Sequence, residues 1–459
     1  LQGLSRSKKE AAHLRGDELS LEDVTIDGRK VEMTRILYKL CRCCYLAKDN
    51  LLPLVALRIL DTTIRDGITE YSPVSYAIIG MVLNGILFDV HGGRHYAEFA
   101  LALVHKFEFR RYHAATATIC YGIVLHWTRP IRSVLRPLML GYESGLQVGD
   151  TENALWCLYF HLCFSFHAGR PLESLDADAR VHMNQFIDLK RGEILPFFKI
   201  IWQSCRHLMI ADTTAREDPL LLTGDIMDEQ LLLETLEETS NEKLQSLISH
   251  MKQILAVFFG KHDRGSQFAL SRKNEVLQRK LPGLIAGSVD PFYRGFSLFC
   301  MARRTRSRCY IREARRQRKL LKKFVEKGNV NNLHLVAMLD AEAAAFNGDY
   351  KNAKKCWESA LLLSRGFLHH TALAFERYGE FLYHEMGDPL EAAFRIDQAV
   401  KAYREWGCVA KVNILVAKYG SIISTLSSDD LWFSTSFPSI LTEKDDTSGR
   451  SAANLLVSP

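Results

Sequence analysis

Hydrophobic residues recur at intervals of three and four along most of the chain, the spacing that places them on one face of an α-helix. One such run is Ile36, Leu37, Leu40 and Cys44, and a second run with the same period follows Pro53. The helix-favouring residues Ala, Leu, Glu, Lys and Arg dominate these periodic segments, and the chain has only 12 prolines. The pattern predicts an all-α protein with little or no sheet.

A helix–turn–helix unit occurs twice between Leu333 and Trp406. The first copy turns at Gly348 and the second at Gly387, and this step of 39 residues lies within the range of paired-helix repeats. In a tetratricopeptide-type unit, small residues let two helix axes approach, and one large side chain fills the remaining space. The first copy places Ala341, Ala353, Trp357 and Ala360 at these positions, and the second places Tyr383, Ala392, Ile396 and Ala399 there.

Breaks at similar distances occur earlier in the chain, at Gly92, Pro130 and Gly169, so the repeat starts well before these two units. The segment from Trp156 to Phe166 is apolar nearly all round and is expected to form a helix in the middle of a stack. We therefore predict an α-solenoid of stacked antiparallel helix pairs with tetratricopeptide-like repeats.

Changes in composition divide the chain into segments. Charged stretches without an apolar period indicate linkers, and the lapse of the helical pattern after Met209 indicates a loop. The chain starts with Leu1 and has no initiating Met, so we expect a fragment of a larger gene product. The predicted segments are a disordered linker at 1–30, an N-terminal helical repeat half at 31–212, a loop at 213–228, a C-terminal helical repeat half at 229–420 and a disordered tail or linker at 421–459.

The composition is typical of a globular protein in a reducing compartment. Of 459 residues, 47% are hydrophobic and 24% are charged. The 11 cysteines are odd in number and scattered through apolar stretches, which favours free thiols and a cytoplasmic location. No apolar run is long enough to predict a membrane span. The net charge of +6 is small for this length and does not favour nucleic acid as a partner.

A run of basic residues after Ala302 is the main candidate for a binding surface. Such a run can hold nucleic-acid phosphates, anionic lipid or an acidic protein. The alternative is a solvated helix face with Ile311, Ala314, Leu321 and Phe324 buried, and it is favoured because no aromatic residues alternate with the charges. The run consists of Arg303, Arg304, Arg306, Arg308, Arg312, Arg315, Arg316, Arg318, Lys319, Lys322 and Lys323, with Glu313 as the opposing charge.

Other motifs predict no catalytic, cofactor or metal site. Cys41 and Cys44 form a C-x-x-C without a second pair, so buried thiols are the favoured interpretation. Lys261 lacks the upstream glycine of a phosphate loop, and His384-Glu385 has no second histidine for a zinc helix. Histidines at helix ends and on aromatic faces are expected to be core or capping residues; these are His91, His161, His167, His369 and His370.

Several longer motifs resemble the helical region of the large predicted-ATPase signalling proteins. They are Leu51–Val55 with Asp66-Gly67, Ser72-Pro73, His126-Trp127, Gly141–Asp150, Tyr403–Gly407 and Ala410–Val412. In that family a P-loop ATPase module precedes a tetratricopeptide-like array, which leads to histidine-kinase or cyclase output domains. The resemblance implies a regulatory scaffold. The family's ATPase motifs do not occur in this sequence, so nucleotide binding is not carried over.

Taken together, these patterns predict a non-catalytic helical-repeat scaffold in signal transduction. Its expected partners are another protein or adjacent ATPase and output domains of the same protein. The alternative is an internal segment of an ATP-dependent protein kinase, histidine kinase or nucleotide cyclase whose catalytic domains lie outside this chain.

Overall fold

The computed structural model describes residues 24–25, 27–46, 51–189, 192–210, 218–239, 241–271 and 283–424. Regular secondary structure in these ranges is helical, and extended chain pairs only in an isolated bridge between Val24 and Ile68. The all-α prediction is therefore confirmed. None of the described helices combines the length and the apolar character that a bilayer crossing requires.

The long helices follow one another closely along the chain. They are α2 (Gly28–Leu46), α3 (Leu52–Asp66), α4 (Ser72–Gly85), α5 (Val90–Lys106), α6 (His113–Ile119), α7 (Leu135–Val148), α8 (Thr151–His167), α9 (Leu172–Asp188), α10 (Leu195–Met209), α11 (Glu229–Thr239), α12 (Glu242–Phe258), α13 (His262–Ser271), α15 (Ile285–Thr305), α16 (Arg308–Glu326), α17 (Leu333–Phe346), α18 (Tyr350–Leu363), α19 (Leu368–Phe381), α20 (Pro389–Trp406) and α21 (Val409–Ile423). Short 3-10 turns are η2 (Arg110–Tyr112), η4 (Leu125–Trp127), η5 (Ile131–Val134) and η6 (Val330–Asn332), and π turns are η3 (Cys120–Val124) and η7 (Leu382–Met386).

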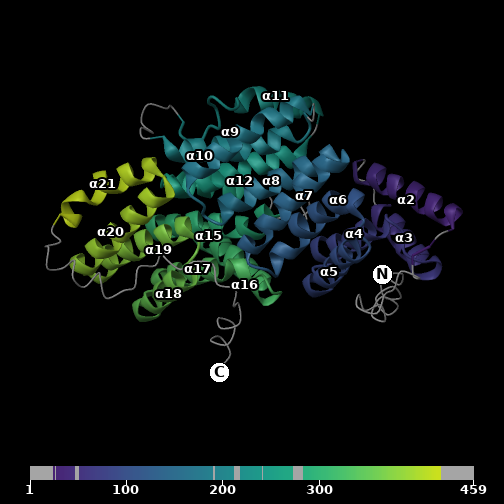
Figure 1. Ribbon diagram of the computed structural model, residues 1–459. Helices are drawn as coiled ribbons and strands as arrows, with labels where there is room; N and C mark the ends of the chain where they lie inside the picture. The colour runs from purple at the N-terminus through teal and green to yellow at the C-terminus, as the bar shows by residue number, and fades with distance from the viewer. Residues whose placement is uncertain are drawn as a thin grey trace.

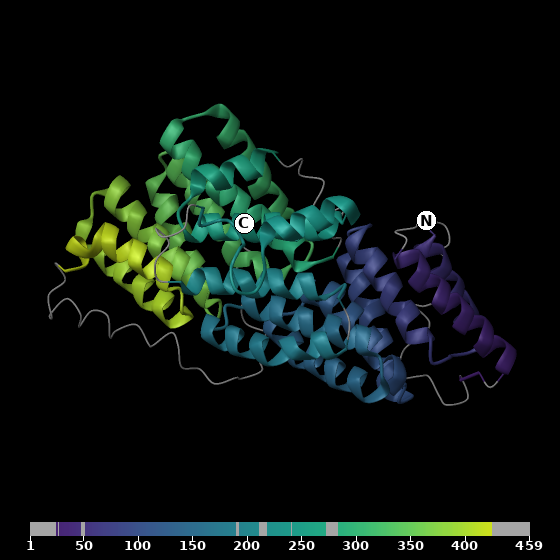
Figure 2. The ribbon, with the colours of Figure 1, turned by 90° about the horizontal axis from the view of Figure 1, so that it is seen from above.

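Helices that are neighbours in sequence are also neighbours in space. The most extensive contacts join α4 with α5, α7 with α8, α15 with α16, α17 with α18 and α19 with α20. Helix α2 lies at one end of the molecule and α21 at the opposite end, as both ribbon views show (Figures 1 and 2). The molecule is therefore an elongated assembly of helix pairs.

Helix α8 lies inside this assembly, as its apolar sequence predicts. Every residue from Ala154 to His167 is buried except Trp156 and His161, which are half-buried. The rings of Trp156 and Tyr159 contact Phe197 of α10, at centroid distances of 5.4 and 5.8 Å. Burial on several sides explains why this helix needs no polar face.

The two clearest repeat units place their small residues at helix contacts. Ala341, Ala353, Trp357, Ala360, Ala392 and Ala399 are all fully buried, and so is Trp406. Gly348 and Gly387 have φ angles of +79° and +66°, which favour glycine, and each ends a helical segment before a short turn. Asp349 and Asp388, which follow the two glycines, cap α18 and α20 with their side chains.

Tyr383 does not occupy the buried position that we expected in the second unit. Its side chain is 37% exposed, because the π turn η7 adds a residue to the helical turn and rotates Tyr383 outward. The close contact is made by Gly379 instead. A Cβ atom on Gly379 would lie 2.6 Å from Cγ1 of Ile396, so only glycine leaves room for the buried Ile396 side chain.

Three predicted boundaries differ from the structure. Gly92 lies in the first turn of α5, because the side chain of Asp89 accepts a hydrogen bond from Gly92 N and starts the helix earlier. Helix α2 starts at Gly28, inside the predicted 1–30 linker, and the Asp27 side chain accepts from Arg29 N. Helix α21 continues to Ile423, past the predicted limit at 420.

The other predicted segments fall partly outside the described ranges. Residues 218–228 contain no helix, in agreement with a loop between α10 and α11. Residues 1–23, 211–217 and 425–459 lie outside the described residues, so the linker, the start of the loop and the tail stay predictions there. The boundary between two halves also stays a prediction.

The predicted N-terminal and C-terminal halves share one buried core. The Asn331 side chain donates hydrogen bonds to the carbonyl oxygens of His126 and Arg129, at 2.7 and 3.0 Å, and accepts one from Ile131 N at 2.9 Å. Nearby, Trp127 Nε1 donates to the carbonyl oxygen of Gly283 at 3.0 Å. Buried hydrophobic side chains form a single cluster from Cys41 to Tyr419.

Candidate interaction surface

Most of the basic run lies on α16, and the sequence of this helix separates two faces. Ala314, Gln317, Leu321 and Phe324 are buried, with the spacing of one helix face. Ile311 is half-buried beside them. The opposite face carries the cations, so α16 is a surface helix whose apolar side belongs to the core.

Three of the eleven basic side chains form ion pairs with carboxylates of this protein. Arg303, on α15, pairs with Glu342 at 3.0 Å and also with Glu385. Arg318 and Lys322 both contact the carboxylate of Asp340 on α17, and the Lys322 contact is 2.9 Å. These three cations hold neighbouring helices together and are not free to bind a partner.

The remaining eight basic residues are exposed: Arg304, Arg306, Arg308, Arg312, Arg315, Arg316, Lys319 and Lys323. Some of them make surface contacts. The Arg306 guanidinium lies over the Phe346 ring at 5.4 Å, Arg315 donates to Asn347 Oδ1 at 3.0 Å, and Arg316 is 3.7 Å from Glu313.

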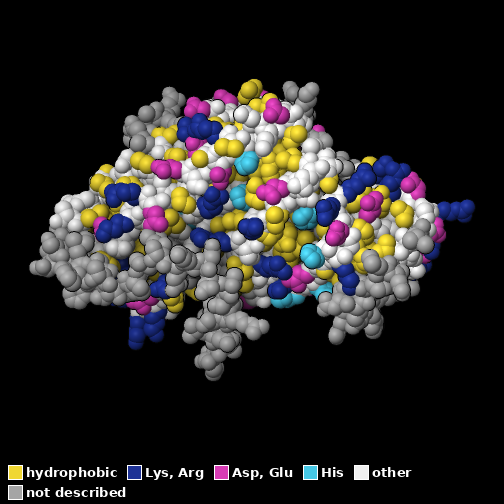
Figure 3. Space-filling view, in the orientation of Figure 1, with side chains coloured by type: hydrophobic (Ala, Val, Ile, Leu, Met, Phe, Trp, Pro, Cys, Tyr) yellow, Lys and Arg dark blue, Asp and Glu magenta, His cyan; other side chains and the backbone are white. Residues whose placement is uncertain are grey.

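Six of these cations lie along one side of α16 and form what we call the basic stripe, consisting of Arg308, Arg312, Arg315, Arg316, Lys319 and Lys323. Arg308, Arg312, Lys319 and Lys323 have no ion-pair or hydrogen-bond partner among the described residues. A shallow depression of about 610 Å³ follows the N-terminal half of the stripe, lined by Arg308, Cys309, Ile311, Arg312 and Arg315. In Figure 3, by contrast, basic and acidic side chains are interspersed on the face that is drawn.

A buried ion network runs beside this surface and joins successive helix pairs. Glu342 on α17 is fully buried between Arg303 of α15 and Arg377 of α19. Burial acts to raise the pKa of Glu342, but the charges of Arg377 and Arg303 outweigh it and hold the pKa below its usual value. Glu380 continues the network to α21, where Lys418 Nζ lies 2.8 Å away.

Sequence reasoning missed this network, although the repeat carried a signal for it. Arg303 and Glu342 are 39 residues apart, which is the step between the two repeat turns. Glu380 and Lys418 are separated by a similar distance, so opposite charges occur at equivalent positions of successive units. A search for such pairs at the repeat spacing would have identified Arg303, but not Arg318 and Lys322, whose partner Asp340 lies closer along the chain.

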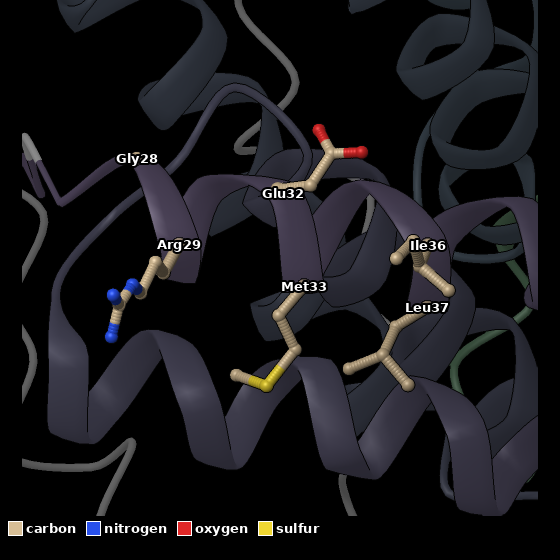
Figure 4. Close-up of a pocket in the computed structure, with 6 residues that line it drawn as sticks. All are labelled: Gly28, Arg29, Glu32, Met33, Ile36 and Leu37. Carbon is tan, nitrogen blue, oxygen red and sulfur yellow. The ribbon is translucent and has the colours of Figure 1, made fainter.

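A second surface feature lies on α2 and α3, where large apolar side chains are exposed. Ile36 is 59% exposed and Leu54 is 61% exposed, and Met33, Leu40 and Leu51 are exposed as well. A depression of about 570 Å³ runs along the first half of α2, lined by Gly28, Arg29, Glu32, Met33, Ile36 and Leu37. Figure 4 shows Met33 and Leu37 projecting from one side of α2, while the Glu32 carboxylate points to the opposite side.

Buried histidines of α17 and α19 gather beside Tyr293 of α15. His370 Nδ1 lies 2.8 Å from His334 Nε2, and His370 Nε2 lies 2.9 Å from the Tyr293 hydroxyl. His369 stacks beside His370, with ring centroids 3.7 Å apart. Burial lowers the pKa of His334 to about 3 and holds the pKa values of His369 and His370 well below the ordinary value.

The two outer cysteines of the C-x-x-C motif lie in the core. Cys41 and Cys44 are buried and Cys43 is exposed. Burial raises the pKa of the Cys41 thiol to about 12, so this thiol is a poor nucleophile. Across the described ranges, no group of three or more His, Cys, Asp and Glu side chains is arranged to hold a metal ion.

Known proteins add no further assignment to these surfaces. Comparisons of the chain with protein-family models, with curated proteins and with solved structures found no match.

Proposed function

We propose that the chain is an α-solenoid of tetratricopeptide-like helix pairs that acts as a non-catalytic scaffold in signal transduction. It binds a protein partner or an adjoining domain, as one part of a larger ATPase-containing signalling protein. Support comes from the repeated turns at Gly348 and Gly387, from the packing of consecutive helix pairs and from the resemblance at both ends of the array.

The exposed apolar face of α2 and α3 is the observation that carries this proposal. In an array of helix pairs, each pair covers an apolar face of the next, and an end face that remains apolar needs a cover of its own. Ile36 and Leu40, four residues apart on α2, and Leu54 on α3 expose large hydrophobic side chains at this end. Patches of this kind mark protein contact sites.

Hydrogen exchange tests the proposal. Backbone amides of α2 and α3 are compared between the chain alone and the protein as its gene encodes it. Slower exchange in both helices of the longer protein is expected, because a docked domain suppresses local opening. Helix α18, which lies near the opposite end, serves as the internal control. Equal exchange of α2 and α3 in the two proteins would contradict a contact at this face.

A further inference from the structure

We propose that the basic stripe of α16 binds an acidic helical segment of a protein partner. This inference rests on the proposed scaffold function and names the partner class for a second surface, distinct from the apolar face of α2 and α3. The stripe extends from Arg308 to Lys323, which is about 22 Å along a straight helix.

The protein already contains one example of the contact that the partner would make. Arg318 and Lys322, four residues apart on α16, hold the Asp340 carboxylate of the neighbouring helix α17 between them. Among the exposed cations of α16 that have no ion-pair or hydrogen-bond partner in the described part of the chain, this spacing occurs twice, with Arg308 four residues before Arg312 and Lys319 four residues before Lys323. Each of these two pairs has room for a carboxylate of the same kind.

The spacing of the two pairs selects a helix as the ligand. Arg308 and Lys319 are 11 residues apart, and so are Arg312 and Lys323. Eleven residues make about three helical turns, so carboxylates at this interval on a partner lie on one face of an α-helix, about 16 Å apart. A helix lying along α16 can therefore meet both pairs, with Arg315 and Arg316 between them.

Other anionic ligands suit this surface less well. The apolar side of α16, including Leu321 and Phe324, is buried in the core, so the helix has no apolar face to insert into a membrane. The stripe carries no aromatic side chain on which nucleic-acid bases could stack. The depression beside Cys309 and Ile311 adds a half-apolar wall, which fits a side chain of a protein helix.

The test uses the full chain and two fluorescent helical peptides of equal length and equal acidic charge. In the striped peptide, the glutamates recur at intervals of three and four residues on one face, and in the dispersed peptide they are spread around the helix. The striped peptide is expected to bind at least about tenfold more tightly, with affinity that falls as salt rises. Equal affinities for the two peptides would overturn the proposal, even if no variant folds.

Charge-reversal variants show which helix binds the striped peptide. The double variant R312E/K319E is expected to lose striped-peptide affinity by at least about tenfold. The matched control K351E/K355E reverses two exposed lysines of α18, gives the same change in net charge and is expected to bind normally. The peptide should also slow alkylation of Cys309 but not of Cys43, since both thiols are exposed and only Cys309 lies beside the stripe.

Two further outcomes count against the proposal. Tighter stripe-dependent binding of a single-stranded oligonucleotide, or of vesicles containing anionic lipid, would assign the stripe to that ligand class instead. Equal loss of binding in the α16 and α18 variants would show that net charge alone explains the binding of the peptide. The result is independent of hydrogen exchange at α2 and α3, so a failure here is distinguishable from a failure of the scaffold proposal.

Discussion

At the scale of single residues, Trp357 shows how much of the repeat depends on one side chain. Its indole ring is fully buried among small residues, including Ala353 and Ala360 of the same helix. The indole Nε1 has no hydrogen-bond partner among the described residues. The ring therefore stabilises the fold by filling space and not by hydrogen bonding.

Replacing Trp357 with alanine should lower the free energy of unfolding by about 3–5 kcal/mol, because the surrounding helices cannot close the cavity. Trp357→Phe keeps most of the apolar contact and removes the unsatisfied N–H, so a loss below about 2 kcal/mol is expected. Urea unfolding followed by circular dichroism measures both values. Equal stability of the alanine variant and the natural protein would contradict the buried position.

Residue-level patterns in the sequence predicted small residues at helix crossings, and Ala341, Ala353, Ala360, Ala392 and Ala399 are buried. They did not predict Tyr383, since a single added residue in a π turn changes the direction of every side chain in that turn. They also did not separate Arg303, Arg318 and Lys322 from the exposed cations, because a charge run does not show which carboxylates another helix will supply.

At the scale of helices, buried charges hold successive pairs in register. Glu342 connects α17 to both α15 and α19 and has no exposed surface. Glu391 makes a comparable connection near the surface, where Lys354 of α18 reaches it from a half-exposed position. The two carboxylates therefore make the same kind of contact in different surroundings.

Glu342→Gln should lower the free energy of unfolding by about 3 kcal/mol, because it removes the fully buried carboxylate that Arg303 and Arg377 share and leaves them only Glu385 and Glu380. Glu391→Gln is the matched control and should cost at most about 1 kcal/mol, as surface ion pairs usually do. Denaturant titration of the two variants measures the difference. A Glu342 variant no less stable than the Glu391 variant would show that this carboxylate is not needed to balance the arginines.

At the scale of the whole molecule, the sequence predicted helices but not the contacts between segments that are far apart in the chain. One such contact joins Asn331 to residues 126–131, some 200 positions earlier in the chain, and buried histidines of separate helices also lie side by side. The local spacing of hydrophobic residues contains no information about such distant pairs. His167, His369 and His370 are buried, as expected for core residues, whereas His91 is exposed, and only the fold places His370 beside His334.

Mild acid should weaken the packing around the buried histidines. The buried histidines keep depressed pKa values in the folded protein, so the unfolded chain takes up protons first as the pH falls below about 6.5. Stability is therefore fully present above that pH and is lost as the pH falls towards the folded pKa values, by up to about 1.4 kcal/mol per pH unit for each histidine.

Urea unfolding between pH 7 and pH 5 measures this dependence. Replacing His369 with asparagine should reduce the slope of stability against pH by the contribution of one histidine. An identical slope in the natural protein and the His369 variant would contradict a lowered pKa for the buried His369 side chain.

We propose that the array binds a protein through the apolar face of α2 and α3. Photo-cross-linking residues placed at Ile36 and at Leu54, in the protein as its gene encodes it, test it most directly, with Val181 of α9 as a control that is 69% exposed. The account predicts that cross-links from positions 36 and 54 map to one defined segment and that those from position 181 do not. Absent cross-links at positions 36 and 54, or scattered ones like those from position 181, would contradict it.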